Sequence, residues 1–78
     1  MKFIIYTKEN CIHCKQVKQV FKLKNLSYDE YKLDEDFDAK FFIKEFGKGT
    51  TFPQVILDEV SIGGAADTIK YLKEKNII

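Results

Sequence analysis

The hydrophobic pattern of the chain changes period at Cys11, and this change constrains the fold more than any other feature of the sequence. Residues 2–7 form a short apolar run rich in β-branched and aromatic side chains, which predicts a buried strand. From Cys11 the apolar residues recur at helical spacing, which predicts a helix that ends near Asn25. Asn10, between the two segments, suits a helix N-cap or a turn. The chain therefore begins with a strand that leads directly into a helix.

The middle of the chain predicts a second strand and a second helix. Residues 27–33 alternate in polarity around two tyrosines, as in a half-buried strand. The acidic run at 34–36 suits the start of a helix, because carboxylates are favoured at the positive end of the helix dipole. Phenylalanines then recur at helical spacing, and Gly47 provides a stop signal. The phenylalanines that we expect on this helix are Phe37, Phe41, Phe42 and Phe46.

The last third of the chain predicts a pair of strands followed by a helix. The strands occupy residues 54–57 and 60–62, and the two-residue turn Asp58-Glu59 joins them. After Gly63-Gly64 interrupts the pattern, residues 65–76 predict the final helix. The residues of this helix that we expect to face inward are Ile69 and Leu72.

The order of elements, β-α-β-α-β-β-α, indicates an α/β fold in a single domain that spans residues 1–78. The first two strands flank a crossover helix and are expected to be parallel. The last two strands are joined by a tight turn and are expected to be antiparallel. A four-stranded mixed sheet flanked by three helices, with helices on both faces, follows from this order.

The charge balance gives no sign of a nucleic-acid or membrane partner. Thirteen lysines oppose twelve acidic residues, for a formal net charge of +1, and the chain contains no arginine. The apolar run at the start is too short for a signal-peptide core or a transmembrane span. We therefore expect a cytoplasmic protein and, since no oligomerisation pattern is present, a monomer. Two cysteines in that compartment need an explanation other than a structural disulfide.

Cys11 and Cys14 lie where the first strand gives way to the first helix, and this position favours redox chemistry. The N–H groups of a first helical turn have no intrahelical partners, and the helix dipole adds partial positive charge there. Both effects stabilise a thiolate, so we expect the pKa of Cys11 to lie below the usual ~8.5. Cys14, one turn further on, is expected to be less exposed. Cys11 is therefore the predicted attacking thiol and Cys14 the resolving thiol.

Three other interpretations of the cysteine pair are weaker. A structural disulfide that closes so short a loop would constrain the unfolded chain little. A zinc site needs four ligands, whereas the chain has only these two cysteines and one histidine, His13. A soft-metal clamp for Cu(I) is the remaining alternative, as in small carrier domains whose Cys-x-x-Cys also follows a first strand. We favour redox chemistry and expect no bound metal.

Three blocks of the sequence, taken together with their spacing, resemble the glutaredoxin family along nearly the whole chain. The blocks are Tyr6-Thr7-Lys8-Glu9-Asn10-Cys11-x-x-Cys14, Thr50-Thr51-Phe52-Pro53-Gln54-Val55 and Gly63-Gly64-Ala65-Ala66-Asp67. The resemblance implies a thioredoxin fold and the reduction of protein or glutathione mixed disulfides, with glutathione as co-substrate. It also implies that the Phe52–Pro53 peptide bond is cis and lies opposite Cys11.

The resemblance further implies a glutathione site. Its residues would be Lys8, His13, Thr51, Phe52, Pro53, Gly64, Ala66 and Asp67. The backbone of Phe52 would pair with the tripeptide like an added strand. The helix start after Gly63-Gly64 would receive the γ-glutamyl carboxylate, and Asp67 would pair the neighbouring ammonium group. Lys8 would attract a carboxylate, and Lys40 is a further candidate for the glycine carboxylate.

Ile12-His13 departs from the family pattern, in which many members carry Pro-Tyr between the cysteines. A cationic imidazole beside Cys11 would stabilise the thiolate further. Because this stabilises the reduced form, we expect a less negative redox potential than in a Pro-Tyr relative. Phe52 replaces a common valine, for which we expect a changed groove shape rather than a lost function.

Three function classes remain open on the sequence. The first is a glutathione-dependent disulfide reductase. The second is a glutathione-independent redoxin that serves ribonucleotide reductase and is recharged by thioredoxin reductase. The third is a metal or iron–sulfur carrier that uses Cys11 and Cys14. The predicted anion site at Gly63–Asp67, together with Lys8, favours the first class, because a redoxin that ignores glutathione does not need them.

Overall fold

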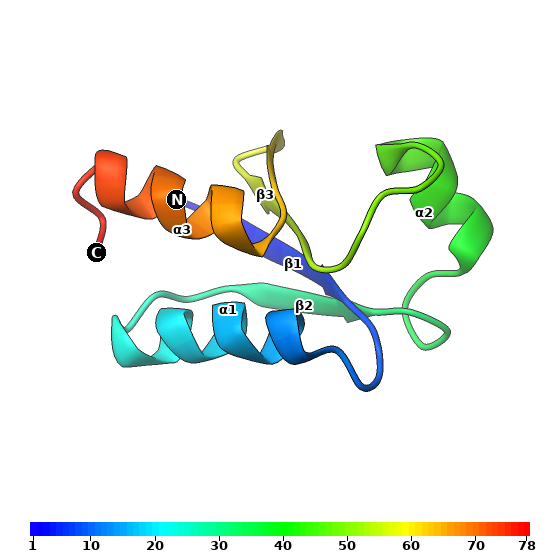
Figure 1. Ribbon diagram of the computed structural model, residues 1–78, viewed down its shortest axis with the longest axis horizontal. Helices are drawn as coiled ribbons and strands as arrows, with labels where there is room; N and C mark the ends of the chain where they lie inside the picture. Colours follow the sequence, from blue (N-terminus) through cyan, green and yellow to red (C-terminus); the bar gives the residue numbers. More distant parts are fainter.

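The computed structural model describes residues 1–78 as seven elements in the order expected from the sequence (Figure 1). The strands are β1 (Phe3–Thr7), β2 (Asp29–Lys32), β3 (Gln54–Leu57) and β4 (Val60–Gly63). The helices are α1 (Ile12–Leu23), α2 (Ala39–Phe46) and α3 (Ala65–Glu74). None of the three combines the length and the apolar character that crossing a membrane requires.

The strands form one mixed sheet in the order β2-β1-β3-β4. β1 runs parallel to β2 and antiparallel to β3, and β3 and β4 form an antiparallel hairpin. Asp58 and Glu59 make the hairpin turn, and both have positive φ angles, as a tight two-residue turn requires. The parallel first pair, the antiparallel last pair and the four-stranded mixed sheet are therefore confirmed.

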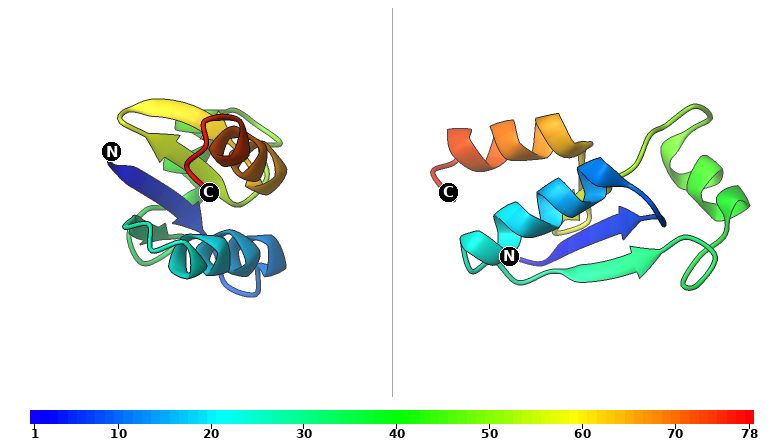
Figure 2. Two further views of the ribbon diagram at one scale, coloured as in Figure 1. Left: turned by 90° about the vertical axis from the view of Figure 1, so that its left-hand side faces the viewer. Right: turned by 60° about the horizontal axis from the view of Figure 1, so that its bottom comes forward.

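The hydrophobic core lies between one face of the sheet and the helices α1 and α3, which lie side by side (Figure 2). Alternate residues of a strand point to the same face, so Phe3 and Ile5 of β1 project into this core together. The other core residues are Val55 and Leu57 of β3, Val17 and Phe21 of α1, and Leu72 of α3. This packing fixes α1 against the two middle strands of the sheet, β1 and β3.

Helix α2 lies apart from the other two helices, at one end of the sheet (Figure 1). Its aromatic residues pack around Tyr6, which projects from the sheet face opposite to that of Ile5. The rings within 6.1 Å of the Tyr6 ring, measured between centroids, are Tyr31, Phe37, Phe41 and Phe46. Burial raises the pKa of Tyr6, and nearby Tyr31 and Glu45 raise it further. Side chains of α2 therefore cover part of the second face of the sheet.

The two expected helix starts have different outcomes. Of the two roles that the sequence allows for Asn10, the structure shows the turn: Asn10 has φ of +53°, while Cys11 is the N-cap of α1. The second expected helix start is wrong. The acidic run at 34–36 does not begin α2, because the Asp36 carboxylate accepts a hydrogen bond from the backbone N–H of Lys32 at 2.8 Å and holds a turn there. The helix begins at Ala39, after the N-cap Asp38, so Phe37 lies outside it.

Smaller differences concern where two elements end and which residues of α3 face inward. β2 is shorter than the expected 27–33, and α3 ends at Glu74 rather than at residue 76. Leu72 is fully buried as expected, whereas Ile69 is only half-buried and Thr68 is the other fully buried residue of α3. A polar Thr is not counted in a hydrophobic pattern, and its hydroxyl faces the Gly63 carbonyl at 3.5 Å.

Candidate active site

Cys11 occupies the N-cap of α1, at the end of the loop that follows β1. Its backbone is extended, with φ −109° and ψ 104°, and its Sγ accepts a hydrogen bond from the backbone N–H of Cys14 at 3.1 Å. The sulfur thus stands where a capping oxygen usually stands, against the unpaired N–H groups of the first turn. The sequence predicted that position for the sulfur, although it did not identify Cys11 itself as the N-cap.

Cys11 and Cys14 form a disulfide, with their Cα atoms 5.2 Å apart. Cys11 keeps 7% of its surface exposed and Cys14 keeps 2%. The expected order of exposure is therefore present, with Cys14 the deeper of the two. A pair of sulfurs placed this way can alternate between a dithiol and a disulfide, and Cys11 is the more exposed of the two.

A groove of about 590 Å³ runs beside the start of α1, between the loop before β3 and the start of α3. We call it the groove; the residues that line it are His13, Gly49, Thr50, Thr51, Phe52, Gln54, Gly63, Gly64, Ala65, Ala66 and Asp67. It gathers most of the residues that the sequence predicts for glutathione binding from three separate parts of the chain. His13, on the first turn of α1, is the residue that brings the groove next to the cysteines.

The wall of the groove includes a peptide bond of unusual geometry and a residue that the sequence did not single out. The Phe52–Pro53 bond is cis, as the family resemblance implied. Pro53 itself is buried, and its carbonyl oxygen lies close to Gly64. Gln54 is only 8% exposed, and its side-chain Nε2 donates to the Thr51 carbonyl oxygen at 2.9 Å. This bond holds the loop before β3 in place, and only the folded chain brings the two residues into that contact.

The start of α3 forms the opposite wall of the groove. Gly64 is the N-cap and offers no side-chain acceptor to the N–H groups of the first turn, which leaves them free to bind an anion. Gly63 has φ of +126°, and a Cβ atom there would lie 2.8 Å from Oδ2 and 3.0 Å from Cβ of Asp67. Asp67 therefore packs closely against Gly63 at the groove. Any other residue at position 63 would displace the Asp67 side chain or the backbone.

Lys8 does not line the groove. It lines a separate hollow of about 80 Å³ that reaches both cysteines. We call this hollow the lysine pocket; it is lined by Lys8, Glu9, Asn10, Cys11, Cys14, Lys15, Lys18 and Lys32. The Lys8 ammonium nitrogen lies 5.5 Å from the centre of the Phe52 ring, a cation–π distance. Lys40 is exposed on α2 and lines neither cavity.

A hydrogen-bonded carboxylate joins α1, β1 and β2 behind the cysteines. Glu30 Oε2 accepts from the buried Thr7 hydroxyl at 2.7 Å and from the Lys18 ammonium at 3.0 Å. Partial burial raises the pKa of Glu30, but the hydrogen bonds from Thr7 and Lys18 and the charges of Lys18 and Lys32 outweigh it, so the pKa lies below its ordinary value. Nothing in the sequence indicates this contact beyond the spacing of Lys18 one turn after Cys14.

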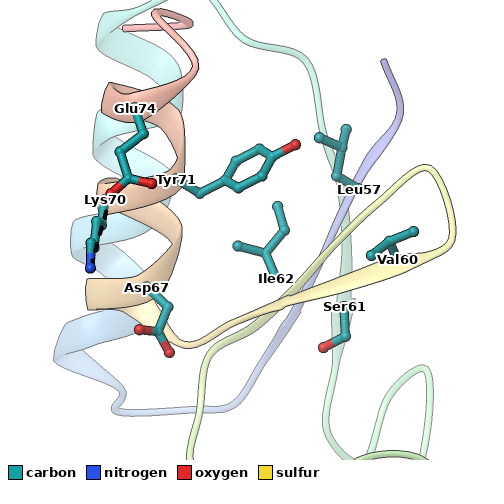
Figure 3. Close-up of a pocket in the computed structure, with 8 residues that line it drawn as sticks. All are labelled: Leu57, Val60, Ser61, Ile62, Asp67, Lys70, Tyr71 and Glu74. Atoms are coloured by element: carbon teal, nitrogen blue, oxygen red, sulfur yellow. Dashed lines mark ion pairs between the residues drawn. The ribbon is translucent and has the colours of Figure 1, made fainter.

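A further hollow lies between α3 and the β3–β4 hairpin (Figure 3). Tyr71 reaches from α3 toward Leu57, and the Ile62 side chain projects from β4 into the space between the hairpin and the helix (Figure 3). Both Ile62 and Tyr71 pack against the hydrophobic core, so this hollow is an outer continuation of the core. Asp67 borders both this hollow and the groove. No three His, Cys, Asp or Glu side chains gather anywhere in the chain in a way that could hold a metal ion.

Comparisons with known proteins agree with this geometry. The family model described as Glutaredoxin matches residues 3–62. Glutaredoxin 1 of Rickettsia prowazekii (strain Madrid E) is 33% identical over 73 residues, which cover 91% of this chain and 77% of that protein. Glutaredoxin 3 of Escherichia coli (strain K12) is 38% identical over 64 residues, which cover 81% of this chain and 76% of that protein.

Solved structures give the same result for the fold. The crystal structure of glutaredoxin 1 from Francisella tularensis, complexed with cacodylate, has a TM-score of 0.80 to this chain at 29% identity. The match covers 97% of this chain and 95% of that one. The thioredoxin fold expected from the sequence is thereby confirmed.

Proposed function

The chain belongs to the glutaredoxin family and is a disulfide oxidoreductase, and on that premise we propose that glutathione supplies the electrons for its reaction. The observation that supports the proposal is the groove, which meets the cysteine pair at His13 and ends at the open first turn of α3. A tripeptide with a carboxylate at its end and a thiol on its central residue fits such a groove.

We assign the chemistry to the two cysteines in fixed roles. The Cys11 thiolate attacks a substrate disulfide, forms a mixed disulfide with one half and releases the other as a thiolate. The Cys14 thiolate then attacks the Cys11 sulfur and releases the reduced product. Two molecules of glutathione restore the dithiol in two exchange steps and leave as glutathione disulfide. When the first substrate is itself a glutathione mixed disulfide, Cys11 alone completes the cycle with a second glutathione.

Glutathione in the groove would bind largely through backbone groups. Its γ-glutamyl carboxylate would accept hydrogen bonds from the first N–H groups of α3 at Ala66 and Asp67, with the Asp67 carboxylate beside its ammonium group. Its central peptide unit would pair with the backbone at Thr51 and Phe52, next to Pro53. His13 would lie beside the cysteinyl part.

The proposed reaction belongs in the cytoplasm, where a glutathione pool keeps thiols reduced. A single chain carries both cysteines and the whole groove, which supports a monomer as the working unit. Protein disulfides are the proposed partners, and ribonucleotide reductase is one such partner.

The test is reduction of a mixed disulfide of glutathione and a small thiol, coupled to glutathione reductase. We expect activity in the wild type, none in Cys11→Ser, and retained activity in Cys14→Ser if glutathione mixed disulfides are the main substrate. Activity with thioredoxin reductase alone, and none with glutathione, would contradict the proposal and favour the glutathione-independent redoxin. Visible absorption of freshly purified protein would instead indicate an iron–sulfur carrier.

A further inference from the structure

We propose that the lysine pocket binds an acidic side chain of the substrate protein beside the disulfide, so that this enzyme reduces disulfides in acidic surroundings in preference to neutral or basic ones. The inference rests on the proposed disulfide reduction and not on glutathione as the reductant. It concerns a part of the surface that the groove does not use.

The lysine pocket and the groove are distinct cavities that meet different parts of the site. They share no lining residue, and only the lysine pocket is lined by both Cys11 and Cys14. A glutathione molecule that contacts the groove residues therefore leaves Lys15 and the deeper lysines of this pocket free, whereas Lys8, at the edge next to Phe52, is also among the residues that the family resemblance implies for glutathione. A protein disulfide that reaches Cys11 brings its own flanking residues with it, and these residues have access to the lysine pocket. Its volume of about 80 Å³ suits the head of one side chain.

Two of the four lysines in the pocket already hold carboxylates of this chain. The Lys18 ammonium lies 3.0 Å from Glu30, and the Lys32 ammonium lies 2.9 Å from Glu9 and 3.6 Å from Glu35. Lys18 of α1 and Lys32 of β2 thus lie at one place, but the charge of each lysine is largely neutralised by its carboxylate partner. They shape the wall of the pocket rather than attract a ligand.

Lys8 and Lys15 supply the positive charge that remains available. No carboxylate of the chain lies within 4.0 Å of either ammonium group. Lys8 is held over the Phe52 ring. Lys15 follows Cys14 directly, and its backbone N–H donates to the Cys11 carbonyl oxygen at 3.2 Å, so its side chain begins one residue from the dithiol. A carboxylate is the complementary charge for this pair.

The chemical step is the ordinary exchange at Cys11. The thiolate attacks one sulfur of a peptide disulfide, a bond from Cys11 to that peptide forms as the peptide S–S bond breaks, and the other peptide leaves as a thiolate. Cys14 then displaces the bound peptide from Cys11, so the protein dithiol is oxidised as the peptide disulfide is reduced. An acidic residue held at Lys15 increases the rate by favouring the encounter and not by changing this chemistry. Exposed ion pairs of this kind correspond to a roughly two- to fivefold effect.

The experiment measures single turnovers of the chemically reduced protein, without glutathione. The substrates are symmetrical disulfides of three short peptides that carry Glu, Gln or Lys on both sides of one cysteine. Each rate is divided by the rate of the same peptide with dithiothreitol, an uncharged dithiol, which removes differences in peptide reactivity. The proteins are wild type, Lys15→Gln, Lys15→Glu and the matched control Lys22→Glu, which reverses an exposed charge on the same helix outside the lysine pocket.

We expect the wild type and Lys22→Glu to prefer the Glu peptide over the Gln peptide by roughly two- to fivefold. Lys15→Gln should reduce this preference, and Lys15→Glu should make the Lys peptide the fastest. The preference should also vanish at about 1 M salt, where charges are screened within ~3 Å. Equal rates for the three peptides with wild type, or a preference that survives Lys15→Glu, would overturn the inference alone. Failure of every peptide to react would overturn it together with the proposed disulfide reduction.

Discussion

The ring of Phe42 lies face to face with the ring of Phe52, with centroids 4.1 Å apart and planes 13° from parallel. Phe42 is buried on α2, whereas Phe52 precedes the cis proline and lines the groove. A second contact joins α2 to the groove, because the Thr50 hydroxyl donates to the Phe46 carbonyl oxygen at 2.7 Å. The helix that lies apart from the core thus supports the residue whose backbone we assign to glutathione.

Replacing Phe42 by leucine should therefore damage both stability and glutathione use. An aromatic pair contributes about 0.5–1.5 kcal/mol beyond the burial of its area, and in a domain of this size 1 kcal/mol lowers Tm by roughly 4–8 °C. We expect a lower Tm and a raised KM for glutathione. The matched control is Phe41→Leu, because Phe41 is on the same helix but 39% exposed. An equal rise of KM in both variants would contradict the role of the stacked pair.

Gly63→Ala should weaken glutathione binding more than it weakens the fold. The left-handed backbone at Gly63 costs an alanine about 1 kcal/mol, and its Cβ would collide with Asp67. Gly49→Ala is the control, since Gly49 also has a positive φ, of 83°, but a Cβ there would meet nothing within 4 Å. Thermal unfolding should show a similar loss in both variants. Steady-state kinetics should show a several-fold rise of the glutathione KM only for Gly63→Ala; an equal KM in the two would count against the role of Asp67.

The pattern of hydrophobic residues was sufficient for the order of elements and for the place of the cysteines. Both follow from local periodicity, and the burial of Cys14 and Val17 at helical spacing agrees with it. The same rule failed at Phe37, which has the spacing of a helical residue but follows a turn held by the Asp36 side chain. The hydrogen bond from the Lys32 N–H to Asp36 stabilises a turn there, although hydrophobic periodicity and the acidic run both favour a helix start.

Long-range contacts around the site could not be predicted from the pattern. Lys32, at the end of β2, lines the same pocket as Lys15 and Lys18 of helix α1, and no spacing rule in the sequence connects this strand with this helix. Such partners depend on how strands are paired and on the register between them.

The Glu30 carboxylate should make the stability of the protein depend on pH. Its folded-state pKa is lowered, so Glu30 stabilises the fold above its unfolded pKa of about 4.3, and this contribution is lost as the pH falls through the folded-state pKa. Thr7→Val removes one hydrogen bond to this carboxylate and should lower the free energy of unfolding more near pH 7 than near pH 3. Denaturant unfolding at the two pH values measures the difference.

Thr50→Val is the control for that experiment. The Thr50 hydroxyl donates to the Phe46 carbonyl oxygen at 2.7 Å, and a carbonyl does not titrate, so its loss should cost the same at both pH values. If Thr7→Val lowers the free energy of unfolding by the same amount at both pH values, as Thr50→Val should, then this contact does not hold Glu30 ionised.

The thiolate at Cys11 is the claim on which the mechanism depends. In the reduced Cys14→Ser variant only one cysteine remains, so the rate of its alkylation by iodoacetamide as a function of pH reports the pKa of Cys11 directly. The serine keeps the backbone N–H that donates to Cys11 Sγ, and the first turn of α1 is unchanged. We predict a midpoint clearly below the ~8.5 of a free cysteine, and a return to that value when the same variant is unfolded in denaturant. A midpoint at or above ~8.5 in the folded protein would contradict the account.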